Sequence, residues 1–348
     1  MANMIFTNKN NISPFLAVWL AMNEYRNETR PNVISATTLI RPIRQVVLAR
    51  KYKDLSKQAD ISDLVSSRMG TALHDSIEKT WNQEPAILKD LLGQFGIPPA
   101  MLDKIKINEP VEDIQEDDIP IWVEQRHEKT VKSTSGNEYI ISGQFDAIVS
   151  WRVFDNKSTS VWTHIYGSND KKYAEQGSIY RWLIPHMIKD DLMQIEHIFT
   201  DWSGVKALQD KQYPQSRILS KTLPLLSYVD TEKMIQDRIN KIDHYLSQDD
   251  SALPLCTDEE LWREKDIFKY YKDPTKLARS TANFGTEAEA VSRQIKEGNV
   301  GMVVKHPGGV KACKYCSVQN VCEQYKQLKL TNQIKELSMI NTMKEKTK

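Results

Sequence analysis

The chain has 348 residues, 40% of them apolar, and its 47 basic and 46 acidic side chains leave a net charge of +1. This length and apolar content allow one large α/β domain or a core domain with appendages. No apolar run is long enough to span a bilayer, and the N-terminus lacks the pattern of a secretion signal. We therefore expect a cytoplasmic protein without a membrane partner. The balanced charge argues neither for nor against a nucleic-acid partner.

The first 64 residues are predicted to form a helical N-terminal region. An apolar stretch runs from Phe15 to Met22, and five basic residues follow further on: Arg41, Arg44, Arg50, Lys51 and Lys53. These basic residues would contact phosphates in one interpretation and form a solvated helix face in the other. The residues alone do not separate the two interpretations.

A second predicted helix carries a histidine beside an apolar stripe. Leu73, Ile77 and Trp81 repeat at helical spacing and predict a buried stripe. His74 lies next to this stripe, and Glu78 follows one turn later, so both side chains can reach the same point. A histidine in such a place is more often a packed core residue than a metal ligand. Both roles stay open at this point.

Two short strands carry the most informative polar residues. Residues alternate through Tyr139–Val149, and a second strand begins at Trp151, which predicts an antiparallel pair. Asp146 lies on the first strand, and Asp155 and Lys157 share a face of the second because they are two residues apart. Two carboxylates beside an ammonium suit a hard divalent cation such as Mg²⁺. The alternative is a surface salt bridge on a hairpin.

The hairpin is flanked by further elements. Before it, residues 121–131 alternate like a strand, on which Glu124 is an accessory acid or, as we prefer, an ion-pair partner of Arg126. After it, an amphipathic helix over 170–183 is predicted. The segment 194–202 is then expected to return as a strand beside the hairpin.

The order of these motifs resembles the RecB-like branch of the PD-(D/E)XK nucleases, which includes exonucleases of CRISPR adaptation and of bacterial or phage recombination. The motifs that carry the resemblance are Gly70-x-x-x-His74, Gly143-x-x-Asp146, Asp155-x-Lys157 and Gln176-x-x-x-Tyr180. It implies an α/β fold with a restriction-endonuclease-like mixed sheet flanked by helices. A helical N-terminal extension and a cysteine-stapled C-terminal module would complete the chain.

The resemblance also implies roles for individual residues. His74, Asp146, Asp155 and the backbone carbonyl of Asn156 would hold Mg²⁺ or Mn²⁺, and Lys157 would position the attacking water. Asp146, Asp155 and Lys157 would thus form the catalytic set. Asn156 stands where such families often have an apolar residue.

The resemblance gives a supporting role to two residues of the predicted helix over 170–183. Gln176 and Tyr180 would support the motif or face DNA. The alternative for Tyr180 is ordinary core packing.

Four cysteines predict a second metal site. Cys313, Cys316 and Cys322 have the spacing C-x₂-C-x₅-C, and the only other cysteine is Cys256. Four thiolates match one tetrahedral Zn²⁺ or one [4Fe–4S] cluster. The C-terminal spacing resembles the iron–sulfur staple of RecB-like nucleases, except that Cys256 follows the nuclease motifs instead of preceding them. We favour the iron–sulfur cluster and keep zinc as the alternative.

These observations divide the chain into five expected parts: a helical N-terminal region over 1–64, a nuclease core over 65–205, a connecting loop and helix over 206–250, a four-cysteine module over 251–325, and a lysine-rich tail over 326–348. The expected function is Mg²⁺-dependent DNA hydrolysis by an exonuclease in recombination, repair or phage DNA processing. Expected partners are DNA and a helicase, recombinase or single-strand binding protein. The alternatives are a catalytically silent protein that binds DNA ends or single strands, and an interaction module that acts only through partners.

Overall fold

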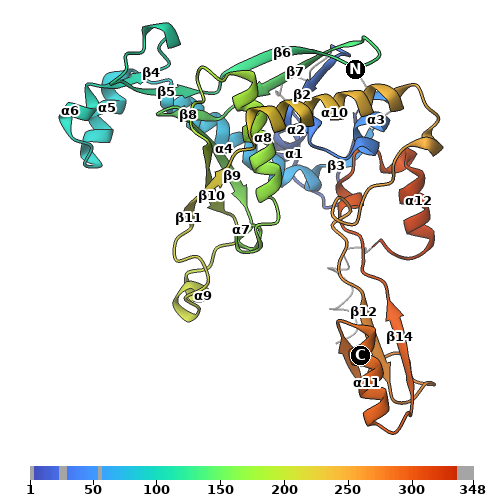
Figure 1. The fold of residues 1–348 in the computed structure, drawn as a ribbon. Coiled ribbons are helices and arrows are strands. Elements are labelled where there is room, and N and C mark those ends of the chain that lie inside the picture. Colours follow the sequence, from blue (N-terminus) through green and yellow to red (C-terminus); the bar gives the residue numbers. More distant parts are fainter. Residues whose placement is uncertain (1–3, 23–29, 54–56, 335–348) are drawn as a thin grey trace. The chain divides into compact units, whose positions relative to one another are not determined.

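The computed structural model describes residues 4–22, 30–53 and 57–334. Contacts divide the chain into two compact units (Figure 1). The first unit comprises Met1–Arg41 and Asp54–His244, and the second comprises Pro42–Lys53 and Tyr245–Lys348. Residues 42–53, which the sequence places with the N-terminal region, thus belong with the cysteine-containing part of the chain. Most of the lysine-rich tail, from residue 335, lies outside the described residues.

A six-stranded mixed sheet forms the centre of the first unit, in the order β11-β10-β9-β8-β5-β4. Its strands are β4 (Ile105–Ile107), β5 (Ile119–Val123), β8 (Ala147–Val149), β9 (Arg152–Thr159), β10 (Leu192–Phe199) and β11 (Ile218–Pro224). The pairs β9–β10 and β4–β5 are parallel, and the other three pairs are antiparallel. Every second residue of β10 is buried, among them Met193, Ile195 and Phe199. The predicted α/β fold with a mixed sheet is therefore confirmed.

Two smaller sheets complete the first unit. A three-stranded sheet in the order β2-β7-β6 contains β2 (Val33–Ser35), β6 (Arg126–Lys132) and β7 (Glu138–Gln144), and a parallel pair contains β1 (Met4–Thr7) and β3 (Lys57–Asp60). Strands β1 to β3 lie in the region predicted to be helical. Val33 and Ile34 explain β2, because β-branched residues on a buried surface favour a strand.

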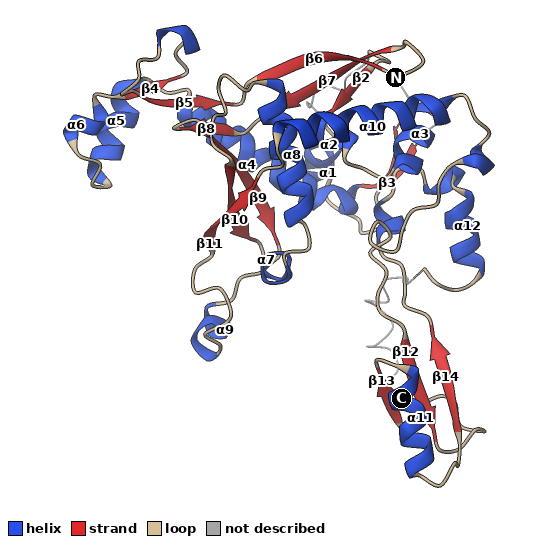
Figure 2. Cartoon of the chain, in the orientation of Figure 1, coloured by secondary structure: helices blue, strands red, loops and turns tan. Residues whose placement is uncertain are grey.

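Helices surround these sheets. Those of the first unit are α1 (Pro14–Ala21), α2 (Ala36–Leu39), α4 (Val65–Trp81), α5 (Pro85–Gln94), α6 (Pro99–Leu102), α7 (Val161–Tyr166), α8 (Asp170–Leu183), α9 (Gly204–Gln209) and α10 (Tyr228–Leu246), the last of which continues into the second unit. Helix α4 contacts β9, whereas α8 contacts β7, β10 and β11 (Figure 2). The stripe Leu73, Ile77 and Trp81 is only half-buried, so the predicted buried stripe is wrong.

The predicted hairpin differs from the structure in one respect. The segment Tyr139–Val149 is not one strand: it breaks at Phe145 and Asp146, with β7 in the three-stranded sheet and β8 in the six-stranded sheet. The hairpin proper joins β8 to β9. Its turn residues Ser150 and Trp151 have φ angles of 48° and 67°, as a two-residue turn that follows the strand twist requires.

The segment 203–228 also differs from the predicted connecting loop. It contains α9 and the edge strand β11, which pairs antiparallel with β10. The strand was missed because its apolar residues do not alternate along the sequence Ile-Leu-Ser-Lys-Thr-Leu-Pro, and only Leu223 is buried.

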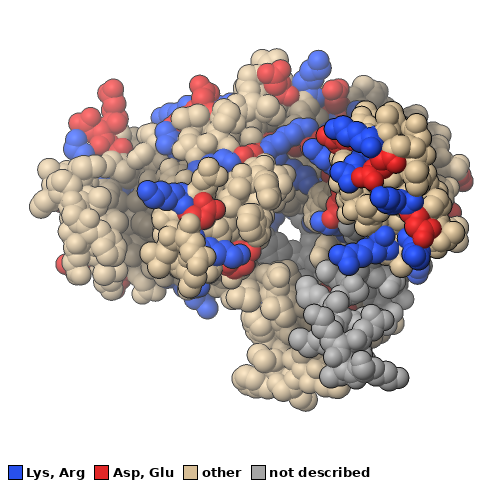
Figure 3. Space-filling model, turned by 90° about the horizontal axis from the view of Figure 1, so that it is seen from below, with Lys and Arg blue, Asp and Glu red and all other residues tan. Residues whose placement is uncertain are grey.

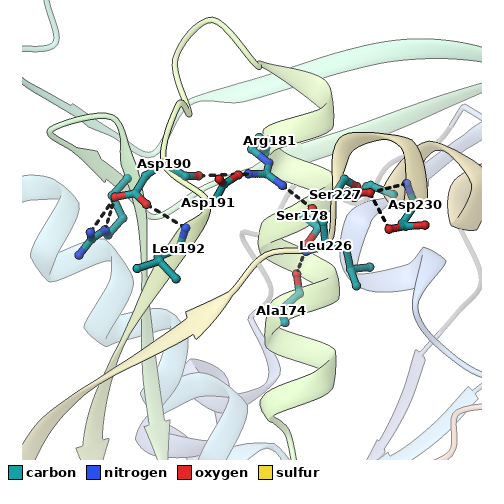
Figure 4. Close-up of polar contacts among 11 residues, drawn as sticks. Ala174, Ser178, Arg181, Asp190, Asp191, Leu192, Leu226, Ser227 and Asp230 are labelled. Carbon is teal, nitrogen blue, oxygen red and sulfur yellow. Dashed lines mark hydrogen bonds and ion pairs between the residues drawn. The ribbon is translucent and has the colours of Figure 1, made fainter.

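A buried arginine ties α8 to the ends of the sheet (Figure 4). Arg181 donates hydrogen bonds to the backbone carbonyls of Asp190 and Leu226 and pairs with the carboxylate of Asp191. Ser178 accepts a hydrogen bond from the Leu226 amide at 2.9 Å. These contacts link α8 to the start of β10 and the end of β11, so they set the position of the helix against the sheet.

The second unit contains α3 (Ile43–Lys51), the antiparallel sheet β13-β12-β14 and two further helices. The bounds are β12 (Ile267–Tyr271), β13 (Ala282–Phe284), α11 (Glu287–Lys296), β14 (Met302–His306) and α12 (Glu323–Leu330). One of its cores joins Val47 and Leu48 of α3 to Leu253, Val318 and Cys322. Helix α3 therefore packs against the segments that carry the cysteines, although these segments are distant from it in the sequence.

Basic and acidic side chains are mixed on one face of the molecule (Figure 3). On the face drawn in Figure 3, lysine and arginine side chains alternate with aspartate and glutamate, in keeping with the net charge of +1. Among the described residues, no helix combines the length and the apolar character that crossing a membrane requires.

We expect Gly143→Ala to destabilise the first unit. A Cβ atom at Gly143 of β7 would lie 2.9 Å from a ring carbon of Tyr180 and 2.7 Å from Cδ1 of Leu183, both on α8. Overpacking of this kind costs about 1–3 kcal/mol. Urea denaturation should show that loss, whereas Gly204→Ala, whose nearest contact would be Trp202 at 3.5 Å, should be tolerated. Equal stability of Gly143→Ala and the wild type would contradict the close packing of α8 on β7.

Candidate functional site

Two strand breaks face each other and bring two carboxylates together. The chain β5–β6 breaks at Glu124 and Gln125, and the chain β7–β8 breaks opposite, at Phe145 and Asp146. The Glu124 amide donates to the Asp146 carbonyl at 3.0 Å, and the Phe145 amide donates to the Gln125 carbonyl at 3.3 Å. Glu124 has a φ angle of 51°, a left-handed conformation that a non-glycine residue seldom adopts.

Helix α4 adds the third ligand candidate. Nδ1 of His74 lies 3.4 Å from Oδ2 of Asp146 and 3.6 Å from Oε1 of Glu124. One ligand atom from each of these three residues lies within 4.8 Å of the others. Glu78, one turn further along α4, is not part of this group. The donor set of one imidazole nitrogen and two carboxylates fits Mg²⁺ or Mn²⁺ completed by water and phosphate oxygen.

Glu124 belongs to the group of ligand candidates, which is the less favoured of its two predicted roles. We expected it to pair with Arg126, but Gln144 stands between them: its Nε2 donates to Glu124 Oε2 at 2.7 Å, and its Oε1 accepts from Arg126 at 2.8 Å. Arg126 also donates to the hydroxyl of Ser142 at 3.1 Å. The only sequence signal was the end of the apolar run at Glu124. This relay holds the Glu124 carboxylate toward His74 instead of toward the arginine.

Asp155 and Lys157 form a pair beside this group. Their side chains lie on the same face of β9, as predicted, with Nζ of Lys157 2.5 Å from Oδ2 of Asp155. Asp155 is 1% exposed, and its burial raises its pKa to about 6, although Lys157 acts in the opposite direction. Burial disfavours the charged form of Lys157, but Asp155 and Asp146 outweigh it, so the pKa of the lysine is raised. Tyr173 of α8 lies against this ammonium, with its ring centre 5.5 Å away.

Asn156 contributes through its backbone in a different way from the one predicted. Its amide donates to Oδ2 of Asp146 at 2.7 Å, which fixes the carboxylate against β9. The role of its carbonyl as a metal ligand stays a prediction. Asp155 is likewise outside the group of three ligand atoms, although it is close enough for the charges of Asp146 and His74 to affect its pKa.

Gln176 and Tyr180 are bound to each other. Nε2 of Gln176 donates to the hydroxyl of Tyr180 at 2.6 Å on the buried face of α8. The ring of Tyr180 packs against Gly143, one residue before Gln144. Both residues therefore support the strand that carries the site, and their contact with DNA stays a prediction.

In the second unit, the four cysteines converge. Cys256, Cys313, Cys316 and Cys322 line one cavity of about 30 Å³, more than the roughly 10–15 Å³ that one water needs. Burial and the neighbouring anionic groups raise the pKa of Cys256 to about 12, and burial and the other thiols raise that of Cys313 to about 11. A bound cation would reverse this preference for the neutral thiols. The donor set therefore fits a zinc ion or an iron–sulfur cluster.

The protonation of His74 makes metal binding pH-dependent. Hydrogen bonds to Asp146 and Glu124 raise the pKa of His74 to about 10. The ion pair stabilises the metal-free fold fully below pH 6.5, and that contribution is lost as the pH rises through about 10. A metal must displace the proton, so we expect Mg²⁺ affinity to rise by about tenfold per pH unit between about pH 7 and 9.

Isothermal titration calorimetry in buffers of different ionisation enthalpy would measure both the affinity and the released proton. His74→Asn should bind more weakly and with a flat pH profile. A wild-type affinity that does not change with pH would refute a direct role for His74.

Comparison with known proteins gives little guidance. No protein-family model and no curated protein matches the sequence. The crystal structure of SSO0001 is 21% identical over 66% of this chain and 85% of that chain, with a TM-score of 0.39. A phage related exonuclease from Haemophilus somnus 129PT is 23% identical over 34% of this chain and 60% of that chain, with a TM-score of 0.22. Similarities of this size carry no argument about function.

Proposed function

We propose that the first unit is a Mg²⁺- or Mn²⁺-dependent DNA nuclease of the PD-(D/E)XK type. The observation that carries the proposal is the group of His74, Glu124 and Asp146 beside the buried pair of Asp155 and Lys157. A structural role alone does not explain why three acidic side chains gather around a histidine and a lysine, because like charges that lie close together destabilise the fold. The motif order supports DNA as the substrate.

Each side chain of the site would have a separate role in the reaction. A bound divalent cation would polarise the scissile phosphate and lower the pKa of a water. Lys157 carries a positive charge at neutral pH, since its pKa is raised, and its Nζ can orient the attacking water and offset charge on the phosphate. Asp155 holds that ammonium at 2.5 Å, and the ring centre of Tyr173 lies 5.5 Å from it. The Asn156 amide holds the Asp146 carboxylate in place.

We propose further that the enzyme is an exonuclease of recombination, repair or phage DNA processing, and that it works with a helicase, a recombinase or a single-strand binding protein. The support for this finer assignment is the resemblance of the motif order to RecB-like nucleases.

Replacing the acidic and basic residues of the site should remove cleavage. We expect Asp146→Asn and Lys157→Met to reduce Mg²⁺-dependent degradation of DNA by at least about 100-fold, because each removes a charge that the reaction needs. Glu124→Gln should reduce it as well and should weaken Mg²⁺ binding. The assay uses end-labelled linear DNA and circular DNA, together with a binding measurement.

Asp75→Asn is the matched control, because Asp75 is an exposed carboxylate next to His74 on the same helix. Its activity should equal that of the wild type. Cleavage that survives in Asp146→Asn and Lys157→Met would overturn the assignment, and cleavage of circular DNA would exclude a pure exonuclease. Tight binding without cleavage by Mg²⁺ or Mn²⁺ would show a silent DNA-binding protein, and neither activity would indicate a module that acts through partners.

We propose a [4Fe–4S] cluster at the four cysteines. The four thiols line one cavity. The C-x₂-C-x₅-C spacing of Cys313, Cys316 and Cys322 resembles the iron–sulfur staple of RecB-like nucleases. This resemblance favours the cluster over a single zinc ion.

Anaerobic purification tests this assignment. We expect a brown protein with about four iron atoms per chain and a visible absorption that bleaches on reduction. Replacing Cys256 by serine should lower the iron content. A colourless protein that carries one zinc ion would show that the site is tetrahedral zinc.

A further inference from the structure

The side chain of Gln324 forms two hydrogen bonds with the backbone of Cys256. Its Oε1 accepts from the Cys256 amide at 2.8 Å, and its Nε2 donates to the Cys256 carbonyl at 3.0 Å. The two residues are 68 positions apart in the sequence. A glutamine amide that pairs with both backbone groups of one residue fixes the position and the orientation of that residue together.

The position of Gln324 links this contact to the other three cysteines. Gln324 stands in the first turn of α12, two residues after Cys322, and it is buried at 9% exposure. It also lines the cavity that the cysteines share. One amide therefore joins the isolated Cys256 to the segment that holds the other three cysteines.

Arg44 restrains Leu253 and Pro254, which lie shortly before Cys256 in the sequence. Its Nε donates to the Pro254 carbonyl at 3.0 Å, and one terminal nitrogen donates to the Leu253 carbonyl at 2.8 Å. Arg44 is 4% exposed and also lines the cavity. The segment that leads to Cys256 is thus held by α3 on one side and by α12 on the other.

We propose that Gln324 is a positioning residue that places Cys256 at the cavity before any metal binds, with Arg44 as a second restraint. The inference rests on the proposed metal centre for its purpose, but the restraint itself is a property of the metal-free chain. Three cysteines within ten positions meet by local geometry, whereas the fourth needs a long-range contact to reach the same point. Outer contacts of this kind usually tune metal affinity by about 10–100-fold.

Cysteine alkylation in the metal-free protein tests the proposal. The full chain is treated with iodoacetamide, and the alkylation rate of each cysteine is measured by mass spectrometry. Cys256 and Cys316 are both partly exposed, so their rates can be compared directly. In Gln324→Leu the rate at Cys256 should rise about tenfold relative to Cys316, because both backbone hydrogen bonds are lost. Arg44→Met should shift the ratio in the same direction.

Gln327→Leu is the control, because Gln327 is an exposed glutamine three residues further along α12. Its alkylation ratio should equal that of the wild type. An unchanged ratio in Gln324→Leu, or an equal rise at all four cysteines, would overturn the positioning role. If circular dichroism shows that Gln324→Leu does not fold, Gln324→Glu replaces it. That variant keeps the oxygen acceptor for the Cys256 amide, and its ratio should rise by less than tenfold and still selectively at Cys256.

Metal release separates this inference from the proposed centre. In the metal-loaded protein, we expect a chelator to remove the metal about 10–100-fold faster from Gln324→Leu than from the wild type. A wild type without metal would refute the proposed centre, while the alkylation ratio would still decide on Gln324. A wild type with metal and equal release rates in both proteins would refute the role of Gln324 alone.

Discussion

The hydrogen bond between the Glu124 amide and the Asp146 carbonyl is the contact on which the candidate site depends. At this point two paired strands leave the six-stranded sheet and continue in the three-stranded one. The break turns two carboxylates toward α4, where His74 meets them. Without it, alternation along the strands would leave Glu124 and Asp146 in the regular pattern of the sheet. The left-handed backbone of Glu124 is the conformational cost of this arrangement.

Both candidate metal sites gather groups that would repel one another if all of them were in their anionic form. Around His74, the carboxylates are balanced by a proton on the imidazole, whose pKa is raised for that reason. At the cysteines, burial and mutual repulsion hold Cys256 and Cys313 in the neutral thiol form. A divalent ion or a cluster would replace the proton in each case. The same electrostatic argument thus applies to two units of different architecture.

Local patterns predicted a large part of this arrangement. The period of two along a strand placed Asp155 and Lys157 on one face, and the ion pair between them confirms it. Helical periodicity predicted the helix over 170–183, which is α8. The segment 194–202 was predicted as a strand, and β10 covers most of it, with every second residue buried. The edge strand β11 was not predicted because its apolar residues do not alternate in the sequence, although its burial does.

The sequence by itself therefore determined some of the elements, among them α8 and β10, the shared face of Asp155 and Lys157, and the clustering of three cysteines, because these depend on neighbours a few residues away. Only the tertiary structure decided that Glu124 joins His74 and Asp146, and that Gln324 holds Cys256. These contacts connect residues 22 or more positions apart, through a strand break in one unit and a side-chain amide in the other. Periodicity carries no information about them, since it records only which face of an element is buried.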